Sequence, residues 1–245
     1  MINDLLLLSG NDIPFISAQI SIRQPSIKEI GMIGEENFYT GCEMLTFSKD
    51  ILQQEDRISL RDRTNFDVFM SIMMSKDSAW RKNKIATLMV LSLLFPDYQI
   101  QFSLDKISLM KEDEIHSING ENFEAFKEII TAMFCLKGGA REQAEAYNPA
   151  GDLARKIAEK LKKGRETVNK QKGPQKIAVL SRYVSILAVG LPMDMNLLLN
   201  LTVYQLFDLF KRSEMKEEFD MYLQAKLAGA RDLKDVENWK IDIHP

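Results

Sequence analysis

The sequence predicts a mainly helical protein, in which an α+β N-terminal domain with a small antiparallel sheet precedes an all-helical C-terminal module. Short apolar runs with strand-like alternation occur only before residue 137, and such runs among helices are typical of the α+β class. After that point the apolar residues recur at helical spacing, and Gly138-Gly139 separates the two regions. We therefore expect domains at 1–137 and 149–245, joined by a linker at 138–148.

The first elements are expected to be a hairpin followed by two helices. The apolar run 5–8 is predicted as a strand, Asn11-Asp12 as a turn, and 13–22 as a half-buried strand with Ile16, Ala18, Ile20 and Ile22 on one face. Pro25 should end this strand and open a helix, because its fixed φ suits a first helical position. That helix would bury Ile27, Ile30 and Ile33. A second helix is expected over 35–45, with acidic residues in its first turn.

Two further helices are expected between residues 64 and 96. Thr64 or Asn65 could cap the first, and Ser78 could cap the second, which Pro96 should stop. The first helix carries an apolar face formed by Phe66, Phe69, Met70 and Met73. Methionines suit adaptable binding surfaces, but at helical spacing a core role for Met70, Met73 and Met74 is the favoured interpretation.

A second group of strands precedes the predicted linker. Residues 98–104 alternate between apolar and polar side chains, and 107–110 and 114–118 are expected as further strands. Asn119-Gly120 should close this ribbon. A helix over 122–136 follows, with Phe123, Phe126, Ile130 and Phe134 on its apolar stripe.

The C-terminal module is expected to contain at least three main helices. The first opens at Asn148-Pro149 and ends at Gly173-Pro174, the second covers 175–189, and a short helix over 193–199 precedes the third. Thr202 and Gln205 form a predicted capping box for that last helix, which should run to Ala228. The apolar tail residues Trp239, Ile241 and Ile243 are expected to fold back onto it.

Composition argues against several classes of function. The chain is 45% hydrophobic and 27% charged, which is typical of globular proteins, and its net charge of -3 gives no overall attraction to nucleic acid or membrane. The most apolar run, 85–95, is about half of the roughly 20 residues that span a bilayer, and the N-terminus lacks the pattern of a signal peptide. Cys42 and Cys135 are too few for a disulfide framework, so a reducing cytoplasm is expected.

No residue pattern indicates catalysis, a cofactor or a metal. The glycines at 31–34 and 138–139 do not fit a phosphate-binding loop. His116 and His244 have no plausible partner, and with the two cysteines they do not show zinc-ligand spacing. Acidic pairs such as Glu217-Glu218 are expected to be solvated on helix faces. We therefore expect a protein that is not an enzyme.

The segment 152–176 is strongly basic, with nine Lys or Arg residues against three acidic ones. It could be a solvated amphipathic helix, a surface that docks an acidic protein, or a nucleic-acid contact. The last is least favoured because no aromatic residue interrupts the run to stack bases. The candidate partner-binding residues are therefore Lys160, Lys162, Lys163 and Arg165 of this segment, together with Tyr204, Phe207, Phe210, Phe219 and Tyr222 of the last helix.

Several stretches resemble a family of tail assembly chaperones from tailed phages of Gram-positive hosts. They are IRQPSIKEIGMIGEENF at 22–38, YNPA at 147–150, ARKIAEKLKKGR at 154–165, SRYVSILAVG at 181–190, LTVYQLFDLF at 201–210, DMYLQAKLAGA at 220–230 and VENWKIDIHP at 236–245. The resemblance implies a non-catalytic protein of the host cell cytoplasm that binds the phage tape measure protein or other tail proteins, with a homo-oligomer as a further possibility. The alternative is a structural virion component, such as a neck, tail-tip or baseplate adaptor.

Overall fold

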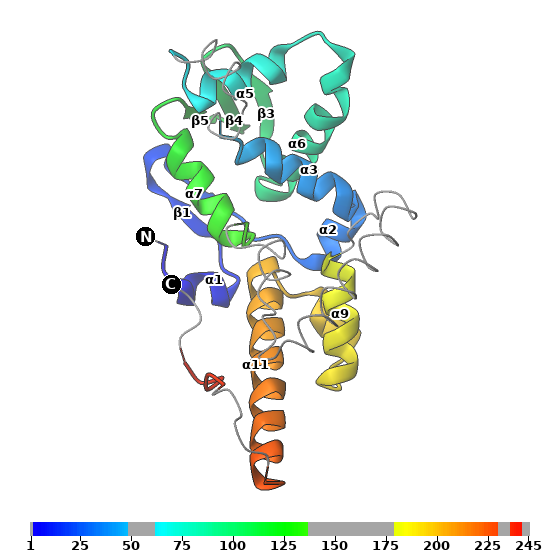
Figure 1. Ribbon diagram of the computed structural model, residues 1–245. Coiled ribbons are helices and arrows are strands. Elements are labelled where there is room, and N and C mark those ends of the chain that lie inside the picture. Colours follow the sequence, from blue (N-terminus) through cyan, green and yellow to red (C-terminus); the bar gives the residue numbers. More distant parts are fainter. Residues whose placement is uncertain (1, 49–61, 137–178, 230–235, 242–245) are drawn as a thin grey trace.

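The computed structural model describes residues 2–48, 62–136, 179–229 and 236–241, and it confirms the predicted fold class. Two small antiparallel sheets with helices form the N-terminal region, and the described part after residue 136 contains helices without strands (Figure 1). No helix in the described ranges is long and apolar enough to cross a membrane. The predicted linker at 138–148 lies outside these ranges, so the division into two domains stays a prediction.

The prediction of a strand over 5–8 is wrong, because these residues lie in helix α1 (Asp4–Ser9). Asn3 caps the helix by accepting a hydrogen bond from the Leu5 amide at 2.9 Å. Gly10 ends it with a left-handed φ of 71°. Four consecutive leucines have neither strand nor helix period, so the capping residues at the two ends decide the structure.

The single strand predicted over 13–22 is instead a hairpin of two short strands. β1 (Ile13–Phe15) pairs antiparallel with β2 (Ile20–Ile22), and a 3-10 turn, η1 (Ile16–Ala18), connects them. Gln19 closes the turn with a left-handed φ of 54°. Ile16, expected on the buried face, is therefore 85% exposed at the tip of the hairpin, whereas Ile20 and Ile22 are buried as predicted.

The next two helices begin and end close to their predicted positions. α2 (Ile27–Ile33) buries Ile27 and Ile30, and α3 (Glu35–Leu45) has the predicted bounds. Ser26 and Glu29 form a capping box at the start of α2 that the sequence prediction missed. Its Ser-x-x-Glu spacing was the signal that could have found it.

The pair α5 (Asn65–Met74) and α6 (Arg81–Leu94) also follows the prediction. Thr64 caps α5 in a capping box with Asp67, and a 3-10 turn, η3 (Ser78–Trp80), leads into α6. The cap of that turn is Asp77 and not the predicted Ser78. Met70 and Met73 are buried in the core, which confirms their predicted role, while Met74 is exposed.

The second sheet has the strand order β3-β4-β5, formed by β3 (Gln99–Phe102), β4 (Lys106–Lys111) and β5 (Glu114–Asn119). Phe102, Ile107 and Ile118 are aligned across it and face the core. Helix α7 (Phe123–Met133) then contributes Phe123, Phe126 and Ile130, and it ends before the predicted Leu136 because Cys135 adopts a left-handed φ of 52°.

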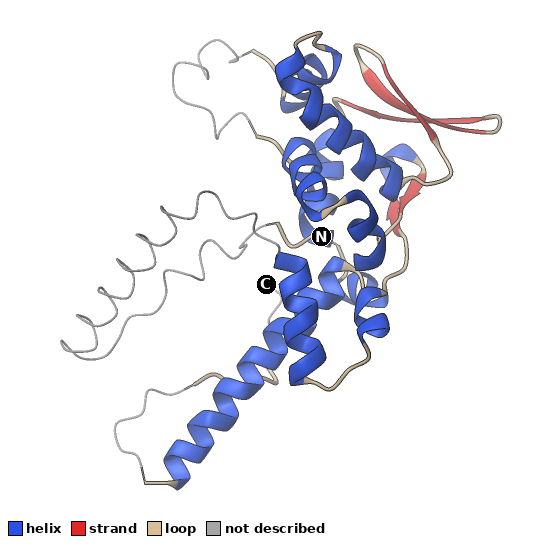
Figure 2. Ribbon diagram, turned by 90° about the vertical axis from the view of Figure 1, so that its right-hand side faces the viewer, coloured by secondary structure: helices blue, strands red, loops and turns tan. Residues whose placement is uncertain are grey.

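The C-terminal helices are α9 (Val179–Gly190), α10 (Met195–Leu199) and α11 (Val203–Leu227). The described part of the helix predicted over 175–189 is α9, and α11 has its predicted start and cap. Figures 1 and 2 show α11 projecting well past α9 and away from the rest of the molecule. The helix predicted to open at Pro149, and its stop at Gly173-Pro174, lie outside the described residues.

Candidate partner-binding helices

Helix α11 is anchored at its first turn by the side chain of Gln205. The Gln205 Oε1 atom accepts a hydrogen bond from the Thr202 amide at 2.9 Å, and the Thr202 hydroxyl accepts one from the Gln205 amide at 3.3 Å. The Gln205 Nε2 atom donates to the Leu8 carbonyl at 2.7 Å, which belongs to the last turn of α1. Gln205 therefore closes the capping box of α11 and also joins α11 to α1.

The caps of α2 and α11 also meet. Ser26 and Thr202 form an isolated antiparallel β-bridge, and the Ile27 amide donates to the Leu201 carbonyl at 2.9 Å. A polar cavity of about 630 Å³ lies beside this junction. The amide of Gln24, a buried residue that lines the cavity, donates to the carbonyls of Leu6 and Asn11 at 3.1 and 2.7 Å.

Two further contacts hold the C-terminal helices against the N-terminal region. The Tyr204 hydroxyl donates to the Asp4 carboxylate at 3.3 Å. Burial, together with the negative charge of Asp4, raises the pKa of Tyr204. The Glu35 carboxylate accepts from the Leu180 amide at 2.7 Å in the first turn of α9, where a negative charge is favourable. The first turn of α11 is thus held against the N-terminal region of the chain.

Three of the predicted partner-binding aromatics pack inside this structure. Tyr204 and Phe210 are buried, and Phe207 is partly exposed. The ring of Tyr183 on α9 stacks on Phe210 with centroids 3.9 Å apart, and it meets Phe207 edge-on at 5.1 Å. Phe207 and Phe210 thus pack α9 onto α11, whereas Tyr204 contacts α1 through Asp4.

The other two predicted aromatics lie on the distal half of α11. Phe219 and Tyr222 are partly exposed. Phe219, Tyr222 and Leu223 lie four, seven and eight residues after Met215, which places all four on one side of the helix. We call these four residues the apolar stripe.

A different side of the distal helix is acidic. Glu214, Glu217 and Glu218 are three or four residues apart and therefore lie on neighbouring positions of the helix surface. Burial raises the pKa of Glu214, the charge of Glu217 raises it further, and Arg182 on α9 opposes the shift. Lys216 pairs with Asp220 at 2.9 Å along the helix.

The described part of the tail returns to α11, as predicted for Trp239 and Ile241. The Arg212 Nη1 atom donates to the backbone carbonyls of both residues, at 3.2 and 3.3 Å. The same guanidinium holds Asp208 at 3.3 Å through its Nε atom. Ile243 and the basic candidates Lys160, Lys162, Lys163 and Arg165 lie outside the described residues.

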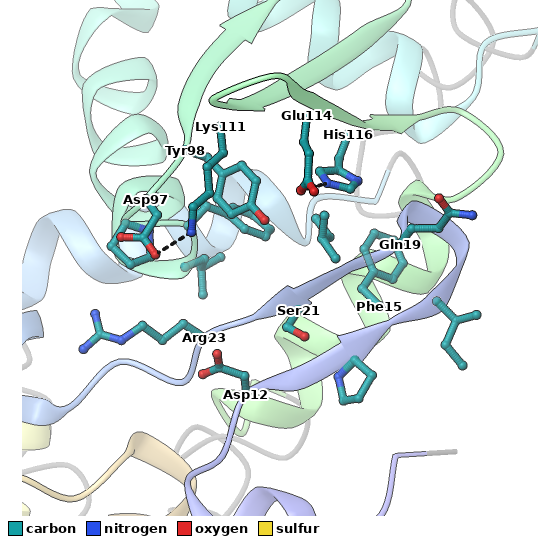
Figure 3. A pocket seen from close by; sticks show the side chains of 16 residues that line it. Asp12, Phe15, Gln19, Ser21, Arg23, Asp97, Tyr98, Lys111, Glu114 and His116 are labelled. Atoms are coloured by element: carbon teal, nitrogen blue, oxygen red, sulfur yellow. Dashed lines mark hydrogen bonds and ion pairs between the residues drawn. The ribbon is translucent and has the colours of Figure 1, made fainter.

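A separate cavity of about 560 Å³ lies between the β1–β2 hairpin and the β4–β5 hairpin (Figure 3). Its wall carries the ion pair of Lys111 with Asp97, at 3.2 Å. His116, for which the sequence indicated no partner, contacts the Ala18 carbonyl through Nδ1 at 3.1 Å and Glu114 through Nε2 at 3.4 Å. The contact of His116 with Ala18 joins the two hairpins, and it links residues too far apart in sequence for their spacing to have revealed it.

The remaining candidate chemistry is that of the cysteines. Burial raises the pKa of the Cys135 thiol to about 12, with a further contribution from Asp208, and burial also raises the pKa of Cys42. Such thiols are poor nucleophiles because the thiolate is disfavoured. In the described ranges no three His, Cys, Asp or Glu residues are grouped so that they could hold a metal ion.

Comparison with known proteins relates one part of the chain to a family. Residues 169–244 match the family model described as the YomV second domain, and this range contains α9, α10, α11 and the returning tail. Neither the curated proteins nor the solved structures that were compared include a significant match. YomV is a protein of a Bacillus prophage, so the match connects the C-terminal helices of this chain to a phage protein family.

Proposed function

We propose that this chain is a non-catalytic bacteriophage tail assembly protein, a chaperone that binds the tape measure protein in the host cytoplasm during tail morphogenesis. The observation that carries the proposal is the distal half of α11, which projects from the molecule with the apolar stripe on one side (Figure 2). A projecting amphipathic helix suits a helical partner, because the two can bury their stripes against each other. The match to a phage-derived family supports the phage setting.

The test is co-purification of tape measure protein expressed together with this chain. We expect Leu223→Lys to abolish it, since a charge in the stripe would have to be desolvated on binding. Ile85→Lys is a matched control, because Leu223 and Ile85 are both helical and are 41% and 43% exposed. If the wild-type chain recovers no tape measure protein, the client assignment fails. If both variants recover it equally, α11 is not the binding site.

A structural virion component is the second candidate function. It is favoured by exposed apolar side chains on α9, where Ile186 and Val189 lie three residues apart on the surface. Permanent contact with another virion subunit would bury them. Mass spectrometry of purified virions separates the two functions: an adaptor is present at a fixed copy number, whereas a chaperone is absent or present in traces.

Nucleic-acid binding is the weakest of the three functions and has a simple test. A gel shift at low salt with the wild-type chain and with Lys160, Lys162 and Lys163 changed to Gln would show a shift lost in the variant if this function were present. Binding through phosphates falls steeply with added salt, so low salt is the most sensitive condition.

A further inference from the structure

The described part of the C-terminal tail contacts α11 through the side chain of Arg212. Both acceptors of the Arg212 guanidinium, the Trp239 and Ile241 oxygens, are backbone carbonyls. The contact therefore fixes the path of the tail along the helix. Trp239 is partly buried and Ile241 is exposed, so the tail lies on the surface of the molecule and not in its core.

Arg212 lies on the same side of α11 as the apolar stripe. Met215 and Phe219 follow it by three and seven residues, spacings that place side chains above one another on a helix. Figures 1 and 2 both show the segment 236–241 beside the middle of α11. The tail thus occupies the side of the helix to which the stripe belongs.

The length of the chain is compatible with a tail that lies beside this part of α11. From Arg212 to Gly229, where φ is 85°, the helix rises about 25 Å at its usual 1.5 Å per residue. The ten residues from Gly229 to Trp239 can span at most roughly 35 Å when fully extended. The chain is therefore long enough to bring Trp239 back to the level of Arg212.

Side-chain exposure on the distal helix agrees with a cover over the stripe. Met215, Phe219 and Tyr222 are only partly exposed. Met221, which lies on the opposite side of the same projecting segment, is 69% exposed. Leu223, the stripe residue furthest along the helix, is 41% exposed, so the lower exposure concerns Met215, Phe219 and Tyr222.

We propose that residues 236–241 are an intramolecular strap, held by Arg212 over the apolar stripe, which a partner helix displaces when it binds. The strap contact stands on the geometry alone, whereas its displacement rests on the proposed function. A strap held by partly solvated backbone acceptors is weak enough to be exchanged for a longer apolar partner. It also shields the stripe from non-specific association before the partner is present.

The strap itself is tested by tryptophan fluorescence of the full chain. The chain has two tryptophans, so Trp80→Phe leaves Trp239 as the sole reporter. In this background we expect Arg212→Ala to shift the Trp239 emission to longer wavelength and to increase its quenching by acrylamide. Lys211→Ala is the matched control, because Lys211 is exposed on the adjacent position while Arg212 donates both hydrogen bonds to the described tail residues. An unchanged Trp239 signal in a folded Arg212→Ala protein overturns the strap.

A second variant keeps the proposal testable if Arg212→Ala does not fold. A chain ending at Asp235 should bind more 1-anilinonaphthalene-8-sulfonate than the full chain, and the added Met215→Lys change should remove that gain. Equal dye binding by the full and shortened chains contradicts a cover over the stripe.

Displacement is tested with co-expressed tape measure protein, of which the shortened chain should recover more. Equal recovery by the full and shortened chains overturns displacement. If neither form recovers any while the tryptophan result holds, the proposed function fails and the strap stands.

Discussion

The side chain of Gln205, in the first turn of α11, donates a hydrogen bond to the carbonyl of Leu8, in the last turn of α1, at 2.7 Å. The two residues are almost two hundred positions apart in the chain. A terminal carbonyl of α1, which has no partner within its own helix, is satisfied by an amide that also completes the cap of α11. Gly10 permits this approach, since a Cβ there would lie 3.2 Å from Gln205 Nε2.

Replacement of Gln205 should therefore weaken both helix ends together. We expect Gln205→Ala to lower the free energy of unfolding by about 1–3 kcal/mol, as two hydrogen bonds are lost. Gln205→Glu separates the contributions, because it retains the acceptor for the Thr202 amide but cannot donate to Leu8 when ionised. Urea denaturation measures both effects.

Gln224→Ala is the control for Gln205, as Gln224 is exposed near the end of the same helix. Its effect should stay within about 0.5 kcal/mol. A Gln205→Glu protein as stable as the wild type would show that the bond to Leu8 contributes nothing.

The capping box of α5 should make stability depend on pH. The hydrogen bond from the Thr64 amide, at 2.8 Å, lowers the pKa of Asp67, the Thr64 hydroxyl lowers it further, and slight burial opposes both. A carboxyl with a depressed folded-state pKa contributes stability that is fully present above its ordinary pKa and is lost as the pH falls through the lowered folded-state pKa. Asp67→Asn should thus cost about 1 kcal/mol at pH 7 and nothing in acid.

The measurement for Asp67 is urea denaturation of the wild type and the variant from pH 7 down to about 3, below the ordinary pKa of a carboxyl. Glu128→Gln, at an exposed position on α7, is the control and should track the wild type throughout. A difference between wild type and Asp67→Asn that persists unchanged in acid would rule out the carboxylate as its source.

Close packing of α3 on α6 depends on Gly41. A Cβ at this position would lie 2.6 Å from the Ala86 carbonyl oxygen and equally close to Val90. Because the helix backbone cannot yield cheaply, Gly41→Ala should destabilise the protein by about 1–3 kcal/mol. Thermal unfolding followed by circular dichroism measures the change.

The same substitution at Gly31 should have the opposite effect on stability. It lies inside α2, and a Cβ there would meet nothing within 4 Å. Gly31→Ala should therefore stabilise the protein by about 0.5–1 kcal/mol, through the better helix propensity of alanine. Equal effects at Gly31 and Gly41 would mean that propensity, and not helix contact, decides both.

Sequence reasoning succeeded where short-range chemistry determines structure. The capping box of Thr202 and Gln205 and the bounds of α3 were predicted correctly, because their determinants lie within a few residues of the element. It failed at α1, where a run of leucines has no period, and at the β1–β2 hairpin, where Gln19 adopts a left-handed turn conformation that its residue type does not signal.

The sequence by itself determined the α+β-then-helical order of this protein and the amphipathic character of α11. Only the tertiary structure decided which aromatic residues of α11 are internal, because Phe210 is covered by Tyr183 from a different helix while Phe219 is partly exposed. The two phenylalanines are nine residues apart and therefore lie on opposite sides of α11, and periodicity alone does not say which side is covered. A helix face becomes core or surface only through the elements packed against it, and here that depends on which side of α11 packs against α9.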